Sequence, residues 1–211
     1  MSTELFGPAP NYDRTGVPAL RTLPLRLAPL TGESLDSWLE ALAAHSDTPW
    51  ADLLAAVGYA HTDPATASRH PPLTASPLQL TSLNYTTGTS PEDLRSMTLA
   101  PLMAVTGCHS DVQTLTLPRS RFCPQCLIDS GGRWQLWWRL RWAFVCPFHH
   151  CLLADACPRC RRQQRVITPP GDFVPTPGMC ALRALNTRAG GRTPRRCGAP
   201  PAQYAQHSAR Q

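Results

Sequence analysis

Cysteine and histidine gather in residues 121–162, and their spacing predicts metal binding. This stretch holds six of the nine cysteines of the chain. Cys123 and Cys126 form a C-P-x-C pair, and Cys146 and His149 follow 19 residues later as C-P-x-H. Two such turns brought together complete the tetrahedron of ligands that Zn²⁺ prefers. We therefore predict one closed, structural zinc site from these four side chains.

A second site is predicted from the cysteines that follow. Cys157 and Cys160 form another C-P-x-C pair, and only Cys180 and Cys197 lie downstream. These four thiolates would hold a second Zn²⁺, although the last gap of 16 residues is longer than a knuckle allows. Cys108 is expected to be a buried thiol without a ligand role.

In the first site, two neighbours of His149 are alternative ligands. His150 and Cys151 follow it directly in the sequence. We prefer His149 because it keeps the C-x-x-H spacing.

Three other interpretations of the cysteines fit less well. A disulfide framework requires an oxidising compartment, and no secretory signal opens the chain. A redox C-x-x-C pair requires a βαβ context, which the surrounding sequence does not supply. A catalytic zinc keeps an open position, usually with a carboxylate nearby, whereas Asp129 and Asp155 are the only acidic residues between residues 119 and 165. We therefore predict structural zinc and no enzymatic activity.

Charge is distributed unevenly along the chain. Residues 1–118 hold 5 Arg and 11 acidic residues, a net charge of −6, and residues 119–211 hold 15 Arg and 3 acidic residues, a net charge of +12. Two zinc sites with seven thiolates would leave about +9 on the second half. This asymmetry predicts a basic half that binds phosphates of nucleic acid. Most of the tryptophans of residues 134–142 are expected in the core, and most of the arginines are expected to be exposed. The candidate nucleic-acid contacts are Arg133, Arg139, Arg141, Arg161 and Arg162.

The first half of the chain is typical of short helices. Leu35, Trp38, Leu39 and Leu42 share one helical face. Thr48-Pro49, Ser76-Pro77 and Ser90-Pro91 each place a capping residue before proline at the start of a helix. No apolar run approaches the ~20 residues that span a bilayer, so we expect a cytoplasmic protein without a membrane segment.

The expected fold is a small, loop-rich α+β protein. It comprises a flexible leader (residues 1–22), a helical, helix-turn-helix-like module (23–118), a tandem zinc-ribbon region (119–198) and a disordered Arg- and Pro-rich tail (199–211). Short strands are expected at residues 115–118 and on both sides of the Cys146–His149 knuckle, over residues 143–155.

Four segments together resemble the TniQ family, which is related to the target-selecting TnsD proteins of transposons. They read LPLRLAPLTGESLDSWLEALA, LRSMTLAPL, RFCPQCL and CPFHHCLLADACPRC. The resemblance covers roughly residues 23–160. Relatives usually close the second zinc site with a C-x-x-C pair, which Cys180 and Cys197 do not form.

The resemblance implies a fold and a role. The fold is a helix-turn-helix-like part followed by tandem zinc ribbons. The role is that of an adaptor that helps to select or mark the insertion site on double-stranded DNA. It recruits an AAA+ ATPase regulator and, indirectly through it, a DDE transposase.

The acidic N-terminal segment is the expected docking surface for the ATPase. Residues 23–58 carry a net negative charge, and Glu33, Glu40 and Asp52 are the candidate contacts. The zinc-binding half is then expected to face DNA. The alternative function is a general zinc-ribbon factor that binds DNA or RNA and has no connection with transposition.

Overall fold

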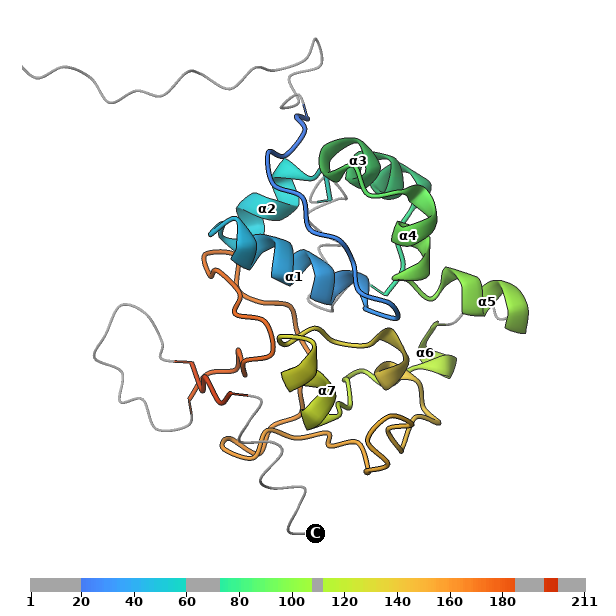
Figure 1. Ribbon diagram of the computed structural model, residues 1–211, viewed down its shortest axis with the longest axis vertical. Helices are drawn as coiled ribbons and strands as arrows, with labels where there is room; N and C mark the ends of the chain where they lie inside the picture. The colour runs from blue at the N-terminus through green and yellow to red at the C-terminus, as the bar shows by residue number, and fades with distance from the viewer. Residues whose placement is uncertain (1–19, 60–72, 108–111, 185–195, 201–211) are drawn as a thin grey trace, which may run out of the picture.

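The structure, a computed structural model, describes residues 20–59, 73–107, 112–184 and 196–200. Most of the expected leader, most of the expected tail and Cys108 lie outside these residues. Figure 1 shows helices α1 to α4 together in the upper half of the view and α7 below them. None of the helices in these ranges has the length and apolar character needed to cross a membrane.

The first two helices are α1 (Leu35–His45) and α2 (Trp50–Ala56). α2 begins at Trp50, with Pro49 and not Thr48 as its N-cap, and it has no side-chain cap. The N–H groups of Trp50 and Ala51 instead donate to the carbonyls of Phe173 and Gly171, at 3.0 and 2.9 Å. A loop of the second half of the chain thus satisfies donors that a helix start leaves unpaired.

Three further helices follow: α3 (Pro77–Thr87), α4 (Pro91–Ser96) and α5 (Ala100–Thr106). The predicted serine caps of α3 and α4 are confirmed. Ser76 and Gln79 form a reciprocal capping box, and the Ser90 hydroxyl accepts from the Asp93 N–H at 3.0 Å.

The helices enclose one apolar core, and Trp38 and Trp50 are buried in it. The helix-turn-helix arrangement itself stays a prediction. The buried core residues are Leu35, Trp38, Leu39, Leu42, Ala43, Trp50, Leu53, Val57, Leu83, Leu94 and Met97.

After α5, the described residues form only the helices α6 (Val112–Leu115) and α7 (Pro124–Asp129) and the 3₁₀ helix η1 (Leu136–Arg139). The strand expected at residues 115–118 is wrong: Leu115 ends α6, and Thr116 forms one isolated bridge with Leu140. Around the Cys146–His149 knuckle, Val145 and Leu152 likewise form a single bridge. Within the described residues, backbone pairing stays at isolated bridges.

A second core lies in the second half of the chain and is built around sulfur and aromatic rings. Trp134 packs edge-on against Phe122 and Trp138, with ring centroids 5.4 and 5.8 Å away. Eight buried or partly buried cysteines belong to the same cluster. Trp142 differs from the other tryptophans of this segment because it is exposed.

The two halves meet along a backbone seam at the start of α1. The Ser34 N–H donates to the Trp134 carbonyl at 2.9 Å, and the Leu136 N–H donates to the Gly32 carbonyl at 2.8 Å. Gly32 has φ +74°, and a Cβ there would lie 2.5 Å from Oε1 of Gln135. The glycine therefore permits both the turn and the close approach.

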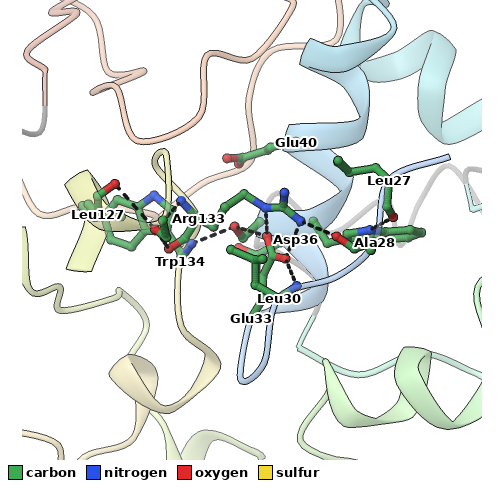
Figure 2. Close-up of polar contacts among 12 residues, drawn as sticks. Leu27, Ala28, Leu30, Glu33, Asp36, Glu40, Leu127, Arg133 and Trp134 are labelled. Atoms are coloured by element: carbon green, nitrogen blue, oxygen red, sulfur yellow. Dashed lines mark hydrogen bonds and ion pairs between the residues drawn. The ribbon is translucent and has the colours of Figure 1, made fainter. Parts of the chain in front are cut away.

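Beside the seam, Glu33 and Arg133 form a buried ion pair, drawn in Figure 2. The Glu33 side chain is fully buried, and its Oε2 accepts from Nη2 of Arg133 at 2.6 Å. The same carboxylate accepts from the Ser37 hydroxyl at 2.8 Å and from the Leu30 N–H at 3.0 Å. Ser37 in turn accepts from the Trp134 N–H at 2.8 Å.

One turn further along α1, a second buried network joins the same two halves. Asp36 accepts from Arg139 at 2.9 Å and from Arg165 at 2.5 Å, and Arg165 also donates to Glu40 at 2.8 Å. Burial by itself would raise the pKa of Asp36, but Arg165 and Arg139 hold that pKa well below its usual range. Asp36 is therefore charged in the folded protein, between two guanidinium groups.

These contacts bury or pair four residues that the sequence indicated as candidate contacts. Arg133 and Arg139 are only 8% and 2% exposed, because Arg133 is paired with Glu33 and Arg139 with Asp36. Glu33 is fully buried, and the Glu40 side chain is 14% exposed and paired with Arg165. Asp52 is exposed, as expected.

We expect Arg133→Met to lower the free energy of unfolding by about 3–5 kcal/mol, because it leaves the buried Glu33 carboxylate without its counter-ion. Urea denaturation of the zinc-loaded protein measures this. Arg141→Met, at an exposed arginine, is the control and should cost about 0.5 kcal/mol or less. Equal stability of the two variants would contradict a structural role for the pair.

Candidate metal centres

The three Cys-Pro knuckles share one backbone turn. In each, the residue four positions after the first cysteine donates its N–H to that cysteine's carbonyl: Leu127 to Cys123, His150 to Cys146 and Arg161 to Cys157, at 3.1, 2.9 and 2.8 Å. The first turn continues as α7, whereas His150 and Arg161 have φ of +49° and +59° and end their turns. The repeated turn points both ligands of each knuckle to the same side.

The first cluster contains the four residues that the spacing predicts. Nδ1 of His149 lies 3.5 Å from Sγ of Cys123, 3.2 Å from Sγ of Cys126 and 3.6 Å from Sγ of Cys146. All four donor atoms lie within 4.8 Å of one another. Zn–S bonds of about 2.3 Å make tetrahedral edges of about 3.8 Å, so these separations suit Zn²⁺.

One neighbour of this cluster, Asp129, was not assigned a ligand or supporting role from the sequence. Nε2 of His149 lies 3.0 Å from Oδ2 of Asp129, which leaves Nδ1 to face the thiols. A carboxylate on the far ring nitrogen is the usual support for a metal-binding histidine. Asp129 stands three residues after Cys126, at the end of α7, and this one-turn spacing is the signal that could have found it.

Cys151 also approaches the first cluster, and His150 does not join it. Sγ of Cys151 lies 3.7 Å from Sγ of Cys123, yet Cys151 is not one of the four mutually close donors. His150 is exposed. The arrangement thus favours His149 as the fourth donor.

The second cluster gathers Cys157, Cys160, Cys180 and Cys197, all four buried. Sγ of Cys157 lies 3.7 Å from Sγ of Cys197, and Sγ of Cys160 lies 3.8 Å from Sγ of Cys180. Cys180 and Cys197 come together through antiparallel pairing. The Cys197 N–H donates to the Leu182 carbonyl at 2.7 Å, and the Gly198 N–H donates to the Cys180 carbonyl at 3.0 Å. Backbone pairing thus replaces the missing C-x-x-C knuckle.

The thiols of both clusters have unequal acidities. Burial raises the pKa of Cys126 to about 11. Burial by itself would raise the pKa of Cys146 and Cys160. Hydrogen bonds from the backbone and side chain of His149 lower the pKa of Cys146 to about 7. Hydrogen bonds from the backbone and side chain of Arg162 likewise lower the pKa of Cys160 to about 7. Burial, and then the negative charge of its neighbours, raises the pKa of Cys197. A dication at the centre of each cluster would remove the repulsion between thiolates.

The remaining candidate arginines lie around the second cluster and before the Cys146 knuckle. Arg161 is exposed. Arg141 is exposed too, and its guanidinium donates to the Gln113 carbonyl at 3.0 Å. Arg162 is half-buried and donates to the Arg183 carbonyl and to Cys160. Arg141 and Arg161 are therefore the two candidates that present charge to the surface.

We expect two Zn²⁺ per chain in the purified protein, measured by elemental analysis. Cys123→Ser should lose the first ion and unfold this half, because such sites contribute folding free energy through the metal. Cys151→Ser is the matched control and should keep both ions. Retention of zinc by His149→Ala together with its loss in Cys151→Ser would show that Cys151 is the ligand instead.

Cys197→Ser should lose one equivalent of zinc and keep the first site. Cobalt substitution checks which site remains, because Co²⁺ bound by three sulfurs and one nitrogen absorbs differently from Co²⁺ bound by four sulfurs. Two equivalents of zinc in Cys197→Ser would exclude the second donor set.

Comparison with protein-family models identifies the family of the chain. No curated protein matches the chain. The family model TniQ matches residues 24–153, which include the seam at Gly32 and Glu33 and all four donors of the first cluster. The match spans more than half of the chain, which therefore belongs to the TniQ family.

Proposed function

We propose that this protein is a zinc-binding adaptor of DNA transposition. It helps to select or mark the target site on double-stranded DNA, and it recruits an AAA+ ATPase that regulates the transposase. The observation that carries this proposal is the TniQ match over residues 24–153, since TniQ membership implies a function in transposition.

The metal centres support a structural and not a catalytic role. Each cluster offers four protein donors, enough to fill a tetrahedral zinc shell and leave no position for substrate or water. When bound, Zn²⁺ would cross-link the knuckles and fix the loops between them. The cysteines and His149 would bind the two ions, and Asp129 would orient the His149 ring. DNA and protein partners would bind to the outer surface of these loops. We expect no catalysis, as is general for this family.

The proposed contact with DNA uses the exposed arginines of the second half. Arg141 and Arg161 are exposed to solvent. Arg133 and Arg139 are instead buried in ion pairs with Glu33 and Asp36. Arginine binds phosphate through several N–H groups, and each such contact releases counter-ions from the duplex. Binding by so few contacts should be weak and sensitive to salt.

A general zinc-ribbon factor unrelated to transposition is the alternative function. The family match counts against it, because this match includes the N-terminal helices as well as the first cluster. The genes beside this one distinguish the two functions. A neighbouring AAA+ ATPase and an integrase-like transposase are expected for the adaptor, and their absence would favour the alternative.

We expect Arg141→Ala with Arg161→Ala to weaken duplex binding and to make the slope of log K against log salt shallower by roughly one to two units. Fluorescence anisotropy with a labelled duplex at several salt concentrations measures both quantities. The control is Arg95→Ala, at an exposed arginine of α4 in the acidic half. If the control changes the slope as much as the double variant, the arginines of the second half have no special role.

A further inference from the structure

Residues 142–153, here called the apolar hairpin, expose more large apolar side chains than any other short segment that the structure describes. Phe148 and Leu152 are 72% and 73% exposed. In Figure 1 the gold segment after residue 140 runs along the lower part of the view, on the side away from α1 to α4. The exposed apolar residues are Trp142, Phe144, Val145, Phe148 and Leu152.

The backbone of the hairpin sets where these side chains lie. The Cys146 N–H donates to the Cys151 carbonyl at 2.8 Å, and the Leu153 N–H donates to the Phe144 carbonyl at 2.8 Å. Val145 and Leu152 are therefore a non-hydrogen-bonded pair, the kind whose Cα atoms approach to about 4.5 Å with side chains on one face. Phe148 stands in the turn between them, inside the Cys146–His149 knuckle.

The hairpin is held in place before any partner arrives. Arg121 donates to the carbonyls of Arg141 and Ala143, at 3.2 and 2.7 Å, and its guanidinium lies 4.5 Å from the centre of the Phe144 ring. Zn²⁺ at the first cluster would fix both ends of the turn. A rigid apolar surface loses little conformational entropy on binding.

Two arginines flank the hairpin. Of the two acidic residues of this region, Asp155 is paired with Arg119, and Asp129 lies in hydrogen-bonding distance of Nε2 of His149. Arg121 and Arg141 stand beside the hairpin and have no acidic partner among the described ion pairs. An apolar surface with aromatic side chains and arginine is typical of a protein interface. Arg121 and Arg141 at its edge fit carboxylates on the partner.

We propose that the apolar hairpin is the docking surface for a protein segment that presents apolar side chains flanked by carboxylates. Under the proposed function, on which this inference rests, that segment belongs to the AAA+ ATPase. In this proposal the hairpin takes the place of Glu33 and Glu40 as the docking surface for the ATPase. Both carboxylates are already paired with arginines inside the protein. The aliphatic residues Val145 and Leu152 favour protein over nucleic acid, since they offer no ring for a base to stack on.

The test compares two double variants of the full chain for binding to the AAA+ ATPase that the proposed function expects among the neighbouring genes, by biolayer interferometry with ATP present. Phe148→Ser with Leu152→Ser is expected to weaken binding about 10- to 100-fold, as loss of central apolar contacts does. Leu78→Ser with Ile167→Ser removes two exposed apolar side chains elsewhere and should bind as wild type. Two equivalents of zinc in both variants show that the fold is kept.

The other outcomes separate this inference from the proposed function. If wild type binds the ATPase and the hairpin variant binds equally well, the hairpin is not the docking surface, although the adaptor function stands. If wild type does not bind the ATPase, the proposed recruitment is wrong and the inference fails with it. A hairpin variant that keeps the ATPase but loses binding to a single-stranded oligonucleotide would make the hairpin a nucleic-acid surface and overturn the proposal.

Discussion

The buried ion pair between Glu33 and Arg133 is the constraint on which the arrangement of the two halves depends. A carboxylate with no exposed surface is tolerated only when hydrogen bonds and an opposite charge replace water. Arg133, Ser37 and the Leu30 N–H supply these partners. Two of them lie within a few residues of Glu33, but Arg133 lies 100 residues away. The folded position of the helices thus requires the zinc-binding half to be in place.

This dependence gives the Gly-Glu-Ser-x-x-Ser-Trp segment a physical explanation. Gly32 allows the turn and the close approach of Gln135, Glu33 pairs with Arg133, and Ser34 and Ser37 bond to the backbone of Trp134. The Trp38 indole donates to the Leu27 carbonyl at 2.9 Å and fills the helical core. This segment, which lies within the range that matches the family, therefore makes an internal contact between the two halves.

The donor clusters and the ion pairs stabilise different parts of this loop-rich chain. Between α7 and residue 200, the described residues contain one short 3₁₀ helix and only isolated bridges, so regular hydrogen bonding stabilises little of this half. Zn²⁺ bound at the two four-donor clusters would fix its loops from within, and Arg133, Arg139 and Arg165 attach it to α1 and the turn before it. Arg133 and Arg139 are thereby buried, whereas an apolar hairpin remains exposed beside the first cluster.

The sequence alone determined the features that depend on neighbouring residues. Helix starts at Ser76 and Ser90, the stripe of Leu35 and Trp38, and the grouping of knuckle ligands all follow from local spacing, because turns and caps are short-range interactions. Only the tertiary structure decided what the charges do. Arg133 and Arg141 look alike in the sequence, and yet one is buried against Glu33 and the other is exposed. The spacing suggested Cys180 and Cys197 as the last two donors of the second cluster. The antiparallel backbone pairing that brings these two cysteines together is visible only in the structure.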